Sequence, residues 1–356
     1  MREIDLSSLQ IRTDLITDTI KSINADITNL NGIEEEKYVI DEIEVSKISS
    51  KEENILNKKK GIYTTISFKD ITDHTNFKKV LEILIKELKY ILEQENFNKD
   101  KKILVVGLGN EKSTPDSLGV KSALKVIVTR HIKEIVGKVE KGYSISSVFI
   151  PGVMGTTGIE SSDLLNKVNE LITPDIILVI DALASDSIDR VCKTIQITNT
   201  GINPGSGIGN KRKEISKEIY KIPVIAIGVP MVVDAVTIVS DTINYMMKHF
   251  SYNLKNKDKA SDKLIPSSKL NYLKQKNLKL NQEEISFFMG AFGGLNDNEK
   301  KLLIHDVLTP IGNNLMVTPK EVDFLLDKLI ELLSKGINNS IHDINWQFNK
   351  SKRTII

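Results

Sequence analysis

The sequence predicts an α/β protein with three layers, α/β/α, in which helices cover both faces of a mostly parallel sheet. Apolar runs of strand length alternate with amphipathic segments of helix length between residues 76 and 250. The runs are continuously apolar, which is typical of strands that are buried on both faces. With 356 residues, 40% of them hydrophobic, the chain is long enough to bury such a core.

Each element of this core is predicted from a local pattern. Apolar residues from Phe77 to Leu92 recur at i, i+3, i+4 and i+7, which indicates an amphipathic helix. The expected strands, each a short apolar run, are 103–107, 146–150, 176–180, 194–198 and 223–228. The other expected helices are 117–130, 160–172 and one within 232–250. Right-handed crossovers between parallel strands place the loops that follow the strands along one edge of the sheet.

Less regular segments flank the core of residues 76–250. Residues 15–75 form a polar N-terminal region with short apolar stretches, and residues 251–282 form a Lys- and Asn-rich excursion. Residues 283–356 are expected to be a helical C-terminal part that packs on the core. Within it, Thr318 and Glu321 form the pattern of a capping box, which predicts a helix from about there to residue 334.

Composition limits the classes of partner and the compartment. The 49 Lys and Arg residues nearly balance the 47 Asp and Glu residues, so the overall charge gives no argument for a nucleic-acid or membrane partner. Cys192 is the only cysteine, which excludes an internal disulfide and a cysteine metal cluster and suits the reducing cytoplasm. The apolar segment 222–239 contains two prolines, a glycine and an aspartate, so it is predicted to be a strand, a turn and a helix, not a membrane span.

Two glycine-rich loops resemble phosphate-binding loops but lack the residues that would complete them. Gly107 and Gly109 follow a strand, yet Lys112 stands where a dinucleotide-binding fingerprint needs its third glycine. The loop 201–212 lacks the Gly-Lys-Ser/Thr ending that would hold phosphate and Mg²⁺. No nucleotide cofactor is therefore predicted. The histidines lie outside the loops at the strand ends, so no metal site is predicted either.

Two aspartates occupy positions at which the catalytic groups of α/β sheets gather. Asp181 directly follows the apolar run 176–180, and Asp116 follows the run 103–107 after a loop. If the two strands are neighbours, both carboxylates face one cleft. Taken singly, each aspartate is better explained as a turn residue or a helix cap. Taken together, at the carboxyl edge of one sheet, they are better explained as a pair.

Six motifs in order carry a resemblance to a known family. They are Gly107-Leu108-Gly109-Asn110, Thr114-Pro115-Asp116-Ser117-Leu118-Gly119, Pro151-Gly152-Val153-Met154-Gly155, Ile180-Asp181-Ala182-Leu183-Ala184, the run 204–213 and the run 315–323. With these motifs the sequence resembles the spore germination protease family of endospore-forming Firmicutes. The resemblance extends from Ile11 almost to the C-terminus.

The resemblance implies an atypical aspartic endopeptidase that degrades small acid-soluble spore proteins during germination. It also implies a self-processing zymogen that assembles as a homotetramer in the cytoplasm of the forespore and in the spore core, without a cofactor or a metal. The family's two catalytic aspartates fall on Asp116 and Asp181, and its α/β core resembles that of hydrogenase maturation endopeptidases. The activation cut falls between Asp14 and Leu15, which makes residues 1–14 a propeptide. The loops expected to line the site contain Gly107, Gly109, Asn110, Gly152, Gly155, Gly205 and Gly207.

Two close carboxylates have a chemistry that fits this activity. They cannot easily both carry charge, so they share one proton. One then acts as a base toward water while the other protonates the peptide oxygen, which suffices for amide hydrolysis without a metal or a covalent nucleophile.

Two alternatives remain open. The first is a nucleotide- or phosphate-binding enzyme, similar to the phosphorylases, that uses the glycine loops; saturable binding of a nucleoside or phosphate would favour it. The second is a non-catalytic spore structural or binding protein in which both aspartates are helix caps. For such a protein, Asp→Asn changes would alter stability and there would be no activity to lose.

Overall fold

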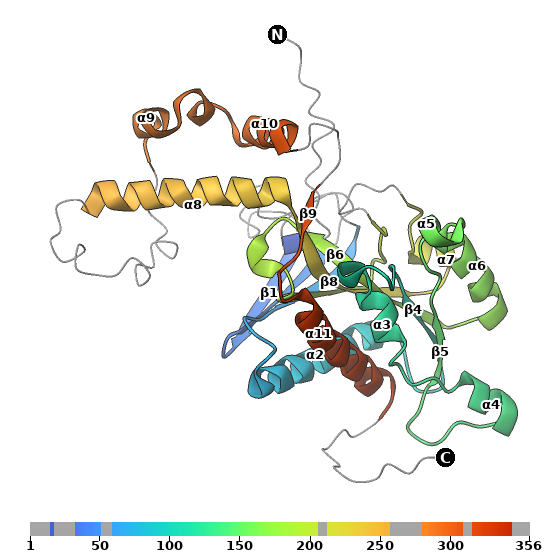
Figure 1. Cartoon of the computed structure of the whole chain (residues 1–356). Coiled ribbons are helices and arrows are strands. Elements are labelled where there is room, and N and C mark those ends of the chain that lie inside the picture. Colours follow the sequence, from blue (N-terminus) through green and yellow to red (C-terminus); the bar gives the residue numbers. More distant parts are fainter. Residues whose placement is uncertain are drawn as a thin grey trace. The chain divides into compact units, whose positions relative to one another are not determined.

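The computed structural model of the chain describes residues 15–17, 33–50, 59–205, 212–256, 280–308 and 315–343 (Figure 1). These residues divide into two compact units. The larger unit comprises the described residues up to 185 together with 189–232 and 318–343, and the smaller unit comprises 186–188 and the described part of 233–317. Both candidate catalytic aspartates belong to the larger unit.

A mixed sheet forms the centre of the larger unit. In the described part of the chain its strands follow the order β1-β2-β3-β7-β8-β6-β4-β5, and a short strand β9 pairs with the end of β8. The strands are β1 Ile33–Ile40, β2 Ile43–Ser50, β3 Gly61–Ser67, β4 Lys102–Gly107, β5 Ile145–Phe149, β6 Ile176–Ser185, β7 Thr194–Thr198, β8 Val224–Asp234 and β9 Met316–Val317.

The α/β class is confirmed, but the sheet is mixed and not mostly parallel. β4 pairs in parallel with β5 and with β6. Antiparallel ladders join β1, β2, β3, β7 and β8. Strands β1 to β3 are hard to predict from the sequence, because an antiparallel strand with one solvated face alternates apolar and charged residues. β1 contains Glu34, Glu35 and Glu36, so it looked like a polar segment.

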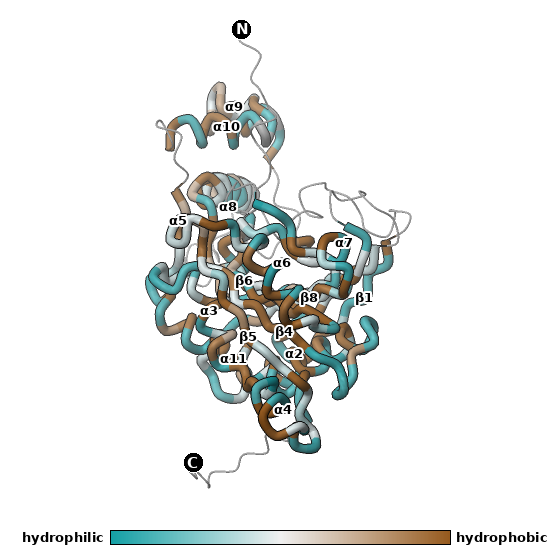
Figure 2. The backbone as a smooth tube through the Cα atoms, turned by 90° about the vertical axis from the view of Figure 1, so that its right-hand side faces the viewer, coloured by the Kyte–Doolittle hydropathy of each residue, from teal (hydrophilic) through white to brown (hydrophobic). Residues whose placement is uncertain are grey.

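Helices pack on both faces of β4 and β6. One face joins helix α6 (Ser161–Ile172) in an apolar cluster, whose strand members include Leu104, Val106, Ile177 and Val179. The other face meets α3 (Leu118–Ala123), since a Cβ at Gly107 would lie 2.5 Å from the carbonyl oxygen of Gly119 and 2.8 Å from the Cβ of Ala123. Figure 2 shows the central strands as mostly hydrophobic. The parallel part of the sheet is therefore buried on both sides, as its continuous apolar runs predicted.

Two long helices form a layer with α3. The predicted first helix is α2 (His74–Gln94), which begins after Asp73, whose carboxylate accepts a hydrogen bond from the backbone N–H of Asn76. It packs against α11 (Val322–Ile341), which also contacts α3 (Figure 1). Gly336 allows the two helices to approach, since a Cβ there would lie 2.5 Å from Cδ2 of Leu84. This layer joins segments that are far apart in the sequence.

Two predicted helix boundaries are wrong. The single helix expected at 117–130 is divided into α3 and α4 (Arg130–Val136). Between them the side chain of Asn338, in α11, donates to the carbonyl of Lys125 and accepts from the N–H of Ile127, so it replaces helical hydrogen bonds. The expected capping box also does not form: α11 begins at Val322, and the hydroxyl of Thr318 donates to the Met231 carbonyl.

The smaller unit is mainly helical. It contains α8 (Ala235–Asn256), α9 (Gln282–Gly293) and α10 (Asp297–Leu308), and α8 packs against α10. The rings of Phe250 and Phe288 stack with centroids 4.6 Å apart, which connects α8 with α9. Most of the predicted Lys- and Asn-rich excursion, residues 257–279, lies outside the described residues. In the described parts of both units, no helix has the length and apolar character needed to cross a membrane.

Gly119→Ala is expected to destabilise the larger unit. The added Cβ would lie 2.3 Å from the carbonyl oxygen of Ile180 and 2.4 Å from that of Leu108, so backbone must move, at a cost of about 2 kcal/mol in the free energy of unfolding. Gly155→Ala is the matched control, since nothing lies within 4 Å of its Cβ position, and should change stability by less than ~0.5 kcal/mol. Urea unfolding followed by circular dichroism compares the two, and equal stabilities would contradict the close packing.

Candidate active site

Asp116 is held at the end of a tight loop that follows β4. It is the last residue of the 3₁₀ turn η3 (Thr114–Asp116). The backbone N–H of Asn110 donates to its carboxylate (N to Oδ2, 2.8 Å) and to its carbonyl oxygen (3.1 Å). Gly109 has a φ of 109°, and a Cβ there would lie 1.9 Å from the carbonyl oxygen of Asp116. Glycine is therefore required at this point of the loop.

Opposing effects act on the charge of Asp116. Burial is the largest and raises the pKa of its carboxyl, because the charged form loses hydration. The N–H of Asn110 and the positive charge of Arg212 both lower this pKa, but by less than burial raises it. Asp116 thus keeps its proton to a higher pH than an exposed aspartate, which is typical of carboxyls at functional sites.

Asp181 lies inside β6, not after its end as the sequence suggested. The strand continues to Ser185, and Asp181 is only 6% exposed. The strand is longer than the apolar run because Leu183 and Ala184 are buried as well. Oδ1 of Asp181 accepts a hydrogen bond from the N–H of Ala182 (2.9 Å). Burying an ionised carboxyl costs free energy unless its charge is compensated by a partner or removed by a proton.

The register of the sheet brings both aspartates to the same end of β4 and β6. Gly107, the last residue of β4, pairs with Ile180, and the N–H of Leu108 donates to the Ile180 carbonyl (2.9 Å). Asp181 follows Ile180 directly, while the loop after Leu108 leads to Asp116 in η3, which packs against β6. The condition set for a pair of aspartates, that the two strands are neighbours, is met, and the strands are parallel.

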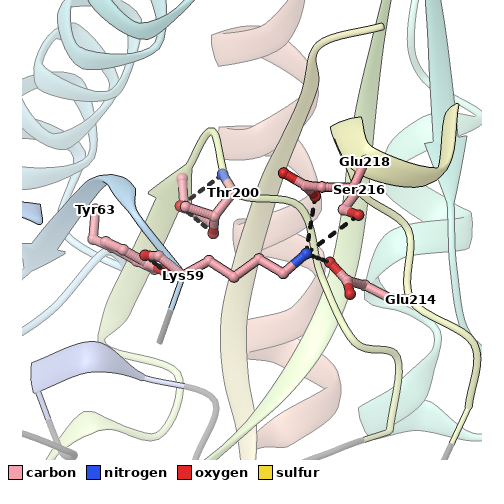
Figure 3. A network of polar contacts seen from close by, with 7 residues as sticks. Lys59, Tyr63, Thr200, Glu214, Ser216 and Glu218 are labelled. Atoms are coloured by element: carbon pink, nitrogen blue, oxygen red, sulfur yellow. Dashed lines mark hydrogen bonds and ion pairs between the residues drawn. The ribbon is translucent and has the colours of Figure 1, made fainter. Parts of the chain in front are cut away.

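Ion pairs directly after Arg212 hold the segment that it begins, residues 213–218. Lys213 pairs with Asp163 of α6 (2.7 Å). Further along, Lys59 binds a group of side chains shown in Figure 3, namely Glu214, Ser216 and Glu218. Neither Arg212 nor Lys59 is predicted from the sequence as part of the site, because no local pattern connects either of them with Asp116.

Residues 15–17 dock on the larger unit. Leu15 and Ile16 are fully buried. The backbone N–H of Ile16 donates to Oε1 of Gln196 in β7 (2.9 Å), and the guanidinium of Arg190 donates to the hydroxyl of Thr17. Asp14, on the other side of the predicted cut, lies outside the described residues. The sequence analysis identified this segment but not the two side chains that bind it.

The other predicted loop glycines have different surroundings. Gly152 has a φ of 72°, and its carbonyl accepts a hydrogen bond from the Ser161 hydroxyl (2.9 Å), which ties the loop after β5 to α6. Gly155 lies in the short helix α5 (Met154–Thr157). Gly205 has a φ of 72°, and Gly207 lies outside the described residues. Among the described contacts, those of Gly109 and Asn110 reach Asp116, and those of Gly152 reach α6.

Cys192 and His342 are buried side chains with structural roles. Cys192 is buried, and burial raises the pKa of its thiol to about 11, so the thiol stays protonated and unreactive at neutral pH. His342 is fully buried and accepts a hydrogen bond from the N–H of Ser144 at Nδ1 (3.1 Å). Within the residues that the structure describes, no three His, Cys, Asp or Glu side chains form a group that could hold a metal ion.

Comparison with known proteins gives the class and the family. A family model described as germination protease matches residues 11–353. The germination protease of Bacillus pumilus is 44% identical over 360 residues, which is 96% of each chain. Those of Geobacillus sp. and Bacillus velezensis are each 42% identical over 361 residues, 96% and 98% of each chain respectively.

Matches of this extent show that the chain is a peptidase. The chain belongs to the germination protease family. This membership favours the peptidase interpretation over the phosphate-binding and the non-catalytic alternatives.

Arg212→Gln is expected to raise the pKa of Asp116 further, because it removes a positive charge that favours the carboxylate. The variant would then keep the proton on this side chain to a higher pH than the wild type. A ¹³C NMR titration of the Asp116 carboxyl carbon measures the change. Arg130→Gln is the control, since Arg130 pairs with Glu134 on α4. An unchanged Asp116 pKa in Arg212→Gln would contradict the proximity of the two charges.

Proposed function

We propose that the chain is an aspartic endopeptidase in which Asp116 and Asp181 form the catalytic pair. The observation that carries this proposal is the placement of a partly buried and a fully buried carboxyl at one end of two adjacent parallel strands. Burial of both disfavours two negative charges together, so the pair holds one proton between them.

In this mechanism the ionised carboxylate removes a proton from a water molecule, whose oxygen attacks the carbonyl carbon of the peptide bond. The protonated carboxyl gives its proton to the carbonyl oxygen. Collapse of the tetrahedral intermediate breaks the carbon–nitrogen bond: the leaving nitrogen takes a proton from the pair, and a hydroxyl of the intermediate returns a proton to it, which restores the shared proton. The two groups titrate as a unit, so the base is assigned to the pair and not to one aspartate.

The surroundings of Asp116 support such a role. Its raised pKa is what a proton-sharing carboxyl requires, and the Asn110 N–H fixes the direction of its oxygens. The charge of Arg212 limits the rise, so that the carboxyl can still ionise during the reaction. The geometry of this loop depends on Gly109, which leaves room for the Asp116 backbone.

Family membership supports the biological part of the proposal. The substrates are small acid-soluble spore proteins, cleaved at the start of germination. The chain is made as a zymogen with residues 1–14 as its propeptide, and it acts in the spore core. The buried position of Leu15 supports a defined activation segment, because a random N-terminal arm would remain exposed.

The proposal includes assembly into a homotetramer. Helix α4 and the turn before it carry large apolar side chains that are exposed on the single chain, such as Ile135 (81%), Val136 (62%) and Leu124 (59%). Apolar patches of this kind are typical of subunit interfaces. These residues are candidates for the contact between copies of the chain.

Asp116→Asn and Asp181→Asn are each expected to lower peptide cleavage by about 10³-fold or more, because an amide can neither share the proton nor act as a base. Cleavage of a purified spore protein, followed by mass spectrometry, measures the loss, and circular dichroism checks that the variants are folded. Asp306→Asn, at an exposed position of α10, is the matched control. Near wild-type cleavage by either site variant would remove that residue from the mechanism.

Self-processing is expected between Asp14 and Leu15 when the full-length chain is mildly acidified, because protonation of carboxylates can release the segment that holds this bond. N-terminal sequencing should then find a new terminus at Leu15 in the wild type and in Asp306→Asn. No such terminus should form in Asp181→Asn. Processing that persists in Asp181→Asn without added protease, or a wild type that stays intact, would contradict self-cleavage.

A further inference from the structure

The side chains that bind residues 15–17 lie beside Asp181 on the same face of the sheet. Gln196 of β7 pairs directly with Gly228 of β8. On the other edge of β8, the N–H of Ile177 donates to the carbonyl of Pro223 (3.0 Å). In a parallel pair the N–H of a residue binds the carbonyl of the residue before its opposite neighbour, so Ile177 lies opposite Val224. Four residues further along both strands, Asp181 lies opposite Gly228. Residues directly opposite each other in neighbouring strands point to the same face, so Asp181 and Gln196 share a face.

The separation of these two residues matches the length of a short peptide. A Cβ at Gly228 would lie 2.4 Å from Cδ1 of Leu183, so Gly228 packs against β6 close to Asp181. Asp181 and Gln196 are thus two strand spacings apart, roughly 10 Å between Cα atoms. The bond before Leu15 is one residue away from the N–H that Gln196 binds, about 3.5 Å along the chain. A peptide of a few residues held by Gln196 is therefore long enough to reach the aspartate.

The same face carries buried hydroxyls that have no partner. Thr65 lies opposite Gln196 in β3, and Thr194 lies two residues before Gln196 in β7. Their exposed fractions are 3% and 1%, and within the described residues neither hydroxyl has a hydrogen-bond partner. A buried hydroxyl without a partner is costly. This face therefore carries polar groups beside Gln196 and is not a purely apolar surface.

We propose that Gln196 and Arg190 bind the substrate peptide on the C-terminal side of the bond that is cut, an inference that rests on the proposed function. Gln196 accepts the backbone N–H of the second residue after the cut. Arg190 donates to a hydroxyl side chain at the third residue, which gives a preference for Ser or Thr there. In the full-length chain, Ile16 and Thr17 occupy these positions.

Gln196 and Arg190 have different roles, because one binds the backbone of the peptide and the other binds a side chain. A side-chain amide oxygen that binds a backbone N–H holds any sequence equally, so Gln196 sets the register of the peptide against Asp181. Arg190 binds a side chain and therefore selects between sequences. The burial of Leu15 adds an apolar site for the residue directly after the cut. The competing explanation is a structural anchor, in which these groups hold only the chain's own N-terminal segment.

Peptides that match residues 9–21 separate the two explanations, because the modification that is tested lies in the peptide. One peptide is unmodified, one is N-methylated at the position of Ile16, which removes the N–H, and one is N-methylated at the position of Ile20 as the control. Each is cleaved by the self-processed wild type and by self-processed Gln196→Met, which keeps the length of the side chain but loses the acceptor. The measured quantity is kcat/KM.

Loss of one buried hydrogen bond corresponds to roughly a tenfold effect. N-methylation at Ile16 should lower kcat/KM about tenfold with the wild type, whereas methylation at Ile20 should have little effect. With Gln196→Met the Ile16-methylated and unmodified peptides should be cleaved equally well. If methylation at Ile16 leaves kcat/KM unchanged with the wild type, or lowers kcat/KM as much with Gln196→Met as with the wild type, Gln196 does not bind substrate and the inference is wrong.

The role of Arg190 is tested in the same way with a peptide that carries Val in place of the Thr at position 17. The wild type should cleave the Thr peptide several-fold faster, and Arg190→Met should lose this difference. An equal preference in both proteins would overturn the assignment of Arg190, and circular dichroism of the variant excludes misfolding as the cause.

A binding measurement keeps this inference separate from the proposed function. Fluorescence anisotropy of the labelled peptides with an Asp181→Asn variant that also carries Ile16→Pro needs no cleavage, and the second substitution removes the N–H by which the chain's own segment binds Gln196. Weaker binding of the Ile16-methylated peptide than of the other two would support the peptide site even if the wild type cleaved nothing, in which case only the proposed catalysis would fail. Equal binding of all three peptides would overturn the site.

Discussion

The close packing of α3 on the ends of β4 and β6 is the constraint on which the rest of the site depends. Gly107 and Gly119 leave no room for a Cβ at this point, and the N–H of Leu108 binds the carbonyl of Ile180 across the same junction. The contact holds the loop that leads to Asp116 against the strand that carries Asp181. Two aspartates that are far apart in the sequence thereby belong to one end of the sheet.

The electrostatic balance at Asp116 is built from segments outside this junction. Burial raises the pKa of the carboxyl, while the Asn110 N–H and the Arg212 charge oppose the rise. Arg212 can act in this way only if its segment is held in place, and the ion pairs of Lys59 with Glu214 and of Lys213 with Asp163 hold the residues that follow it. A loop that resembles a phosphate-binding loop in the sequence thus supplies a cation to a carboxyl site.

The antiparallel half of the sheet has a consequence for the substrate. Its strands extend the face beyond Asp181 through β8 to β7, where Gln196 binds the backbone of residue 16. Parallel strands with helices on both sides would have covered this face. The polar N-terminal strands leave it to a peptide, and in the full-length chain that peptide is the chain's own residues 15–17. In this view the parallel half of the sheet carries the catalytic aspartates, and the antiparallel half binds the peptide.

The sequence by itself determined the α/β class, the central strands and most of helices α2 and α6, because their apolar periodicity is local and strong. It also indicated Asp116, Asp181 and the segment around Leu15, through their positions next to apolar runs and through motifs. Only the tertiary structure decided the mixed strand order, the break between α3 and α4 and the length of β6, since these depend on hydrogen bonds and packing from distant segments. Arg212, Arg190 and Gln196 likewise carry no local signal, because their place in the site depends on ion pairs, strand register and contacts that form only when the chain is folded.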